Sequence, residues 1–153
     1  MRNERYELEL ETDATIFEFT SVGPKGNIRK RVIYSKTQVE GLYNLAFGDK
    51  DLNTGEIDDT VITDNKDSLK VLATVAFTIY TFVKAYPSAW VGITGSTKAR
   101  TRLYQIGISN NLEYIMADFV VLGKKDKVWH PFEKNTEYEA FLITLKKNVR
   151  WKI

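Results

Sequence analysis

The segment of residues 65–85 constrains the fold more than any other part of the chain. Either Asn65 or Asp67 can cap a helix that starts here, and Tyr86-Pro87 ends it near residue 85. The apolar residues of the segment recur so densely that they cover more than one face of that helix. We therefore predict a long, mostly buried helix that lies across a sheet. Its apolar residues are Leu69, Val71, Leu72, Val75, Ala76, Ile79, Phe82 and Val83.

Short segments with strand-like alternation stand on both sides of this helix, and each is bounded by turn residues. They are residues 6–11, 16–22, 28–34, 42–47 and 56–63 before the helix, and 89–94, 119–122, 128–132 and 138–145 after it. Two further helices are predicted at 97–107 and 110–118. Strands and helices do not alternate regularly, which argues against a doubly wound parallel sheet. We predict an α+β fold: a largely antiparallel sheet with one long buried helix and a second helix pair packed on one face.

The chain of 153 residues fits one domain, so we expect residues 1–153 to form a single domain with a frayed basic tail at 146–153. It has no cysteine and one histidine, so the sequence predicts neither a metal site nor a cofactor. Its longest uncharged runs, 71–83 and 85–97, have 13 residues each, whereas crossing a bilayer takes ~20. With a charged start and no apolar signal core, we expect a cytoplasmic protein without a membrane partner.

The motif that carries most chemistry runs from residue 95 to residue 104, after a predicted strand and at the start of a predicted helix. A helix start presents unpaired backbone N–H groups and partial positive charge. Small residues let a ligand approach that backbone, hydroxyls donate to it, and cations add full charge. We therefore predict an anion site, most plausibly for phosphate. Its residues are Gly95, Ser96, Thr97, Lys98, Arg100, Arg102 and Tyr104.

Helical spacing sorts these side chains. Lys98 and Arg102 fall at i and i+4 and share one side of the helix, while Arg100 and Tyr104 share another. The apolar residues Ala99, Leu103 and Ile106 are expected to pack inward. The motif is neither a phosphate-binding P-loop nor a dinucleotide-binding Gly-x-Gly-x-x-Gly, because its glycine spacing fits neither.

Several functions agree with this motif. We favour a non-enzymatic binding module for a phosphate-bearing ligand or nucleic acid. The alternative is a protein-interaction or regulatory domain, in which the arginines form structural ion pairs within the fold or with an acidic protein partner. A weaker alternative is an enzyme that acts on a phosphorylated substrate, which needs a general base near Arg100.

Acidic residues concentrate in the first part of the chain. Residues 1–60 hold 8 Lys and Arg against 12 Asp and Glu, and the remainder holds 14 against 8. The loop 49–59 places Asp49, Asp51 and Asn53 as in a calcium-binding loop. Its glycine, however, falls at position 7 instead of 6, and position 12 is not a glutamate. We predict a polar turn there, and the question is whether it lies beside the basic helix.

Four stretches together resemble a family of small bacterial proteins that is classed as a domain of unknown function. They are residues 19–26, 43–49, 95–104 and 138–142, the third of which contains Gly-Ser-Thr-x-x-Arg-Thr-Arg-Leu-Tyr. The resemblance covers nearly the whole chain. It implies a bacterial, cytoplasmic protein and transfers no catalytic residues.

Overall fold

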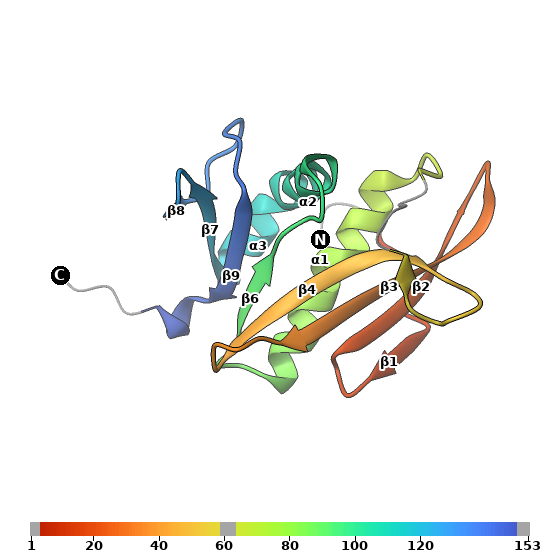
Figure 1. The fold of residues 1–153 in the computed structure, drawn as a ribbon, viewed down its shortest axis with the longest axis horizontal. Coiled ribbons are helices and arrows are strands. Elements are labelled where there is room, and N and C mark those ends of the chain that lie inside the picture. Colours follow the sequence, from red (N-terminus) through yellow and green to blue (C-terminus); the bar gives the residue numbers. More distant parts are fainter. Residues whose placement is uncertain (1–3, 59–63, 150–153) are drawn as a thin grey trace.

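A computed structural model describes residues 4–58 and 64–149 of the chain (Figure 1). Within these ranges, nine strands form one mixed sheet, accompanied by three α-helices and a short 3-10 helix. The sheet is mostly antiparallel, so the predicted α+β class is confirmed.

The first half of the sheet is an antiparallel meander in chain order. Its β2–β3 hairpin turns between Gly23 and Gly26, as predicted, and the positive φ of Gly26 (91°) is a conformation that glycine adopts without strain. The strands are β1 (Leu10–Thr12), β2 (Ile16–Gly23), β3 (Gly26–Lys36), β4 (Leu42–Lys50) and β5 (Ile57–Asp58), the last of which pairs with β4. The predicted partner of β4 extends to residue 63, and its part from 59 onward lies outside the described residues.

The second half of the sheet departs from chain order. The strand β6 (Trp90–Ile93) runs parallel to β4, and the C-terminal strand β9 (Ala140–Leu145) inserts between β6 and β7 (Phe119–Lys125). The edge strand β8 (Val128–Pro131) pairs with β7. This insertion brings the loop that precedes β9 to the same end of the sheet as the β7–β8 turn.

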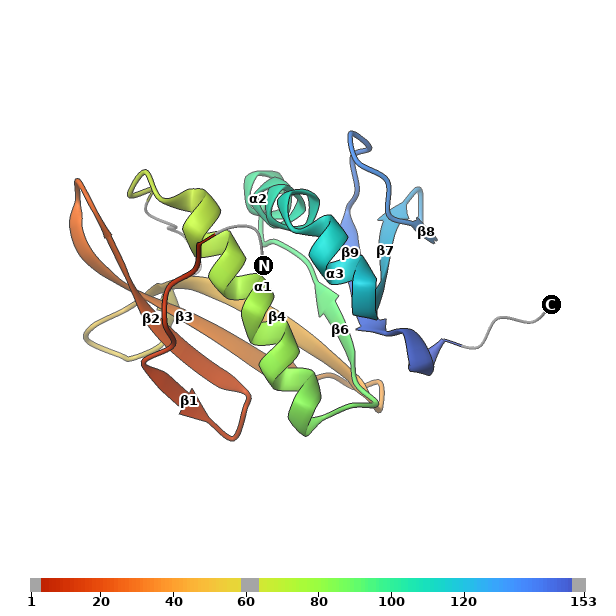
Figure 2. The same ribbon diagram turned by 180° about the vertical axis from the view of Figure 1, so that it is seen from behind.

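All three helices cover one face of the sheet, as Figures 1 and 2 show from opposite sides. They are α1 (Ser68–Ala85), α2 (Lys98–Asn110) and α3 (Leu112–Asp118). Ten residues of α1 are buried, and its Phe82 ring stacks on Tyr34 of β3 at 4.2 Å between centroids. By length and composition alone α1 could cross a membrane, but it packs against the sheet as a core helix does.

The capping mechanism that we predicted for α1 is wrong, although the helix starts where expected. Asp67 occupies the N-cap position without a side-chain cap bond, and its Oδ2 accepts from Ser21 Oγ at 2.6 Å and Tyr6 Oη at 2.5 Å. The Asn65 side chain binds Gly26 O at 2.8 Å and accepts from Lys25 N at 2.7 Å. Both residues therefore tie the start of α1 to the β2–β3 hairpin instead of capping the helix.

The chain ends also differ from expectation. Of the predicted strand 6–11, only its last two residues belong to β1; Tyr6 instead lies beside α1, where its N–H donates to Thr74 Oγ1 at 2.8 Å. Figure 2 shows this segment running along α1 on the helical side of the sheet. The tail begins with a 3-10 helix, Lys146–Asn148, which Asn148 fastens to Pro87 O at 2.9 Å.

The other face of the sheet carries a buried carboxylate. Because side chains alternate along a strand, Glu18 points away from the core that Phe17 and Phe19 enter. It is only 2% exposed, since three cations surround it. They are Arg29 (2.7 Å), Lys50 (3.1 Å) and Arg31 (3.4 Å).

Candidate groove beside helix α2

The start of α2 is a tight turn that hydroxyl groups hold together. Thr97 is the N-cap, and its Oγ1 accepts from Arg100 N at 3.2 Å. Thr101 Oγ1 accepts from Gly95 N at 3.1 Å and donates to Thr97 O at the same distance. A Cβ on Gly95 would stand 2.3 Å from Thr101 N, so only glycine fits this turn. The predicted helix start is thus confirmed, with Thr97 as its cap.

The buried face of α2 is not the one predicted. Ala99 and Ile106 are exposed and Leu103 is half-buried. The helix instead buries a stripe of small and hydrogen-bonding residues: Thr101, Tyr104, Gly107 and Ile108. The absent side chain of Gly107 lets Leu72 of α1 approach, since a Cβ there would lie 3.2 Å from it. A prediction from hydrophobicity alone gives the wrong buried face of α2, because hydrogen bonds to the backbone and close helix packing decide which face turns inward.

Arg100 and Tyr104 share one side of α2, as predicted, and both reach the backbone of β4. Arg100 Nη2 donates to Phe47 O at 2.8 Å, and Tyr104 Oη accepts from Phe47 N at 3.1 Å. The guanidinium also comes within 2.9 Å of the position that a Cβ on Gly48 would take. The basic helix therefore does lie beside β4, the strand that leads into the acidic loop. These two residues serve to hold α2 on the sheet.

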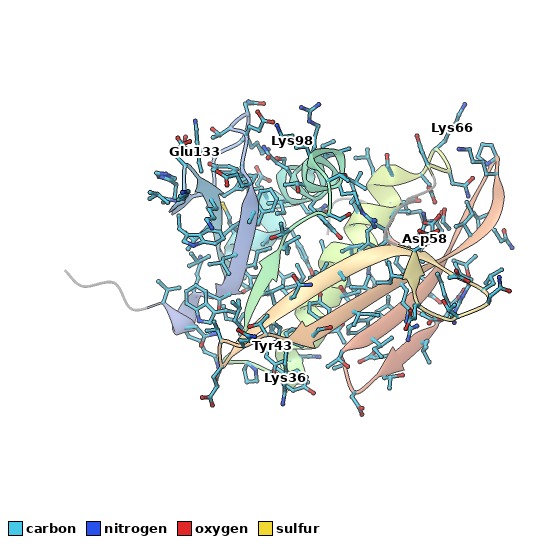
Figure 3. All side chains as sticks on the ribbon, viewed as in Figure 1. Lys36, Tyr43, Asp58, Lys66, Lys98 and Glu133 are labelled. Carbon is cyan, nitrogen blue, oxygen red and sulfur yellow. The ribbon has the colours of Figure 1, made fainter. Side chains whose placement is uncertain are left out.

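Lys98 and Arg102 lie on a different side of α2, where both are exposed and line an open groove of about 930 Å³. Figure 3 shows Lys98 at the same end of the molecule as Glu133, which belongs to the loop between β8 and β9. Of the predicted anion-binding residues, the groove brings together five: Gly95, Ser96, Thr97, Lys98 and Arg102.

The far wall of the groove is the loop between β8 and β9 together with the β7–β8 turn. Gln105 spans the two walls: its Nε2 donates to Thr136 O, and its Oε1 accepts from Tyr138 N at 3.4 Å. The Tyr138 ring packs on Gly123, where any Cβ would come within 2.4 Å of the ring. Tyr138 Oη in turn accepts from Glu133 N at 2.9 Å. These contacts hold the loop at a defined position opposite α2.

The groove is lined by charges of both signs. Its cations are Lys98, Arg102 and Lys125, and its anions are Asp126, Glu137 and Glu139. In the described parts of the chain, no ion pair joins two of these six residues. Glu139 Oε1 accepts from the N–H of Asp126 at 3.1 Å, which fixes the β7–β8 turn.

Sequence reasoning missed the far wall entirely. Gln105 lies seven residues after Lys98, on the same side of α2, so helical spacing could have added it. Lys125 and Glu137 carry no such signal, because they reach the groove only through the places of β7 and β9 in the sheet.

The acidic loop is a polar turn, as predicted. Asp51 Oδ1 accepts from the N–H groups of Asn53 (2.8 Å) and Thr54 (3.2 Å), and Gly55 adopts a positive φ of 74°. Among residues 4–58 and 64–149, no group of three or more histidines and carboxylates is placed to hold a metal ion.

The chain belongs to a family of unknown function, DUF6934, whose model matches residues 2–146. The predicted resemblance to a domain of unknown function that spans nearly the whole chain is therefore confirmed. No curated protein and no solved structure gives a significant match to the chain.

Proposed function

We propose that this protein is a non-enzymatic binding module that holds a small phosphate-bearing ligand in the groove beside α2. The observation that carries the proposal is the shared exposure of Lys98 and Arg102 along one wall of a groove, with the hydroxyls of Ser96 and Thr97 at its end. An arginine can bind a phosphate with two parallel hydrogen bonds, and a lysine adds a point charge beside it.

The dimensions of the groove favour a small ligand over nucleic acid. A volume of about 930 Å³ falls within the range of small-molecule sites. A nucleic-acid backbone that followed this groove would pass Asp126, Glu137 and Glu139, and their carboxylates would repel its phosphates. A single phosphate can bind beside α2 without contacting that wall.

The predicted site divides into two roles under this proposal. Lys98, Arg102, Ser96 and Thr97 contact the ligand, and Gly95 permits the tight turn that places them, since its Cβ position lies against Thr101 N. Arg100 and Tyr104 act as positioning residues, because their side chains bind the backbone of Phe47. The hydrogen bond to the Phe47 carbonyl oxygen supports a structural role for Arg100, whereas the structural ion pairs of the alternative stay a prediction.

Other parts of the prediction stay as proposals. A bacterial origin and a cytoplasmic location are what the family resemblance implies, and we propose both for this chain. A role in protein interaction or an enzymatic role on a phosphorylated substrate would use the same groove, and the titration below separates these alternatives from simple ligand binding.

The test is a titration of the purified full chain with inorganic phosphate, nucleotides and short single- and double-stranded nucleic acids, followed through backbone amide resonances. We expect phosphate and mononucleotides to shift residues 95–102 and Gln105, and to do so less as salt rises. Nucleic acids should shift them no more than a mononucleotide does. An enzyme would instead convert the nucleotide during the titration.

The matched variants are Lys98→Ala with Arg102→Ala, and Lys36→Ala with Lys147→Ala. All four residues are exposed cations, but Lys36 and Lys147 lie outside the groove, and Figure 3 shows Lys36 at the opposite end of the molecule from Lys98. We expect the first pair to lose the shifts and the second to keep them. Unmoved amides at 95–102 in the natural protein, at every phosphate compound tested, would end the proposal.

A further inference from the structure

Resting on the proposed function, we infer that the ligand of this groove is a small phosphorylated amine, with its phosphate against α2 and its ammonium group against the opposite wall. The groove has one cationic wall, on α2, and one wall that is mainly anionic, from the β7–β8 turn and the β8–β9 loop. A ligand with one charge of each sign matches both walls at once.

The distribution of charge carries this inference. Among the residues that line the groove, the α2 wall contributes Lys98 and Arg102 and no carboxylate. The other wall contributes Asp126, Glu137 and Glu139. Three exposed carboxylates in the same groove would weaken binding of a purely anionic ligand by repulsion. The same carboxylates attract a ligand that also carries an ammonium group.

The separation of the two walls supports a bridging ligand. Exposed lysines and arginines that can reach a carboxylate often pair with it, yet no ion pair crosses the groove in the described parts of the chain. The link between the walls is instead the Gln105 side chain, which binds Thr136 O and Tyr138 N. A ligand above Gln105 would fill the space between charges that do not meet each other.

The fixed position of the far wall favours selective binding of a ligand that carries an ammonium group. Tyr138 packs on Gly123, and Glu139 holds the N–H of Asp126, so contacts within the protein itself fix the loop and the turn. A preordered wall loses little conformational entropy on binding, and the ammonium contact can therefore contribute to affinity.

The experiment compares two probes that differ only in the amine: O-phosphoethanolamine and ethyl phosphate. Affinities for the full chain are measured by calorimetry or amide shifts at low salt. Because each exposed charge contact contributes only modestly to binding, contacts of the ammonium group with two carboxylates should make O-phosphoethanolamine bind about 2- to 30-fold more tightly than ethyl phosphate.

The variant for the far wall is Asp126→Asn with Glu137→Gln. Asn keeps the left-handed conformation of residue 126 (φ 51°), so the turn should remain intact. We expect this variant to lose most of its preference for O-phosphoethanolamine, since only Glu139 then remains of the three carboxylates, and to bind ethyl phosphate at least as tightly as the natural protein does. Glu133→Gln is the control, because this exposed glutamate of the same loop, labelled in Figure 3, does not line the groove.

The outcomes separate this inference from the function on which it rests. Equal affinity of the natural protein for both probes would overturn the inference and leave phosphate binding standing. Binding of neither probe would overturn both. A preference for O-phosphoethanolamine that persists in the Asp126→Asn, Glu137→Gln variant would also overturn it, because the amine would then be recognised elsewhere.

Discussion

Arg100 Nη2 donates a hydrogen bond of 2.8 Å to the carbonyl oxygen of Phe47 and so joins α2 to β4. Phe47 lies between the part of β4 that pairs with β6, which ends at Leu45, and the part that pairs with β5, which begins at Asp49. Among residues 4–58 and 64–149, no strand pairs with Phe47 on this edge, where its N–H binds Tyr104 and its C=O binds Arg100. Two side chains of α2 thus bind the β4 backbone between the segments that pair with β6 and β5.

This relationship predicts different consequences for the two neighbouring arginines. Arg100→Ala leaves a buried backbone carbonyl with fewer partners, which costs about 1–3 kcal/mol of unfolding free energy and lowers Tm by about 3–10 °C. Arg102→Ala removes an exposed side chain and should change the unfolding free energy by less than about 0.5 kcal/mol. Thermal unfolding followed by circular dichroism measures both. Equal losses in the two variants would contradict the structural role of Arg100.

Features of the fold that depend on local sequence patterns could be predicted from the sequence. The β2–β3 hairpin follows from alternation around Gly23 and Gly26, and α1 follows from its dense apolar repeat. The i, i+4 spacing also placed Lys98 and Arg102 together correctly. Each of these depends on residues that are close in the chain.

Features that depend on distant segments could not be read from the sequence. Nothing local to β9 indicates that it inserts between β6 and β7, and this insertion is what brings Glu137 opposite α2. The orientation of α2 was also missed, because Tyr104 turns inward to satisfy Phe47 and not to bury the most apolar stripe. Tertiary hydrogen bonds here outweigh helical amphipathicity.

The turn before α2 predicts a strict requirement for glycine at position 95. In Gly95→Ala the new Cβ would lie 2.3 Å from the backbone nitrogen of Thr101, so the helix start must shift. We expect a loss of about 1–3 kcal/mol, typical of overpacking, together with weaker phosphate binding.

The control for this variant is Gly92→Ala in the neighbouring strand β6. A Cβ there would make its nearest contact at 3.6 Å, an ordinary van der Waals distance. We expect it to be tolerated with little change in denaturant midpoint. If Gly95→Ala unfolds at the same denaturant concentration as Gly92→Ala, the turn is more adaptable than the structure indicates.

The buried hydroxyl of Tyr34 should make the folded protein less stable at alkaline pH. Burial raises the pKa of its hydroxyl well above the ordinary value near 10, and the hydroxyl is bonded to Thr78 Oγ1 at 2.8 Å. Above about pH 10 the unfolded chain releases this proton and the folded chain retains it, so unfolding is favoured by up to ~1.4 kcal/mol per pH unit. Below that pH the contribution is fully present and independent of pH.

The measurement is urea unfolding between pH 8 and pH 11 for the natural protein and Tyr34→Phe. The variant keeps the ring stack on Phe82 but has no proton to release, so its stability should fall less steeply with pH. At pH 8 it should be less stable by about 1 kcal/mol, because the bond to Thr78 is lost. Parallel pH profiles for the two proteins would show that Tyr34 ionises as freely in the fold as outside it.

Loss of the buried charge of Glu18 should lower the stability of the protein strongly. The Glu18 carboxylate is 2% exposed and contacts Arg29, Lys50 and Arg31, whereas Glu9, which also pairs with Arg29, is 47% exposed. Glu18→Ala leaves three cations facing one another around a cavity, and removal of one partner from a buried ionic cluster costs about 3–5 kcal/mol. Glu9→Ala should cost about 0–1 kcal/mol, as for other exposed ion pairs.

Repulsion between cations is the cause of the loss in Glu18→Ala but not in Glu9→Ala. At 1 M NaCl the Debye length falls to about 3 Å, so this salt should restore part of the denaturant midpoint of Glu18→Ala. A midpoint for Glu18→Ala that matches Glu9→Ala, or that does not respond to salt, would show that the three cations separate into solvent once the carboxylate is gone.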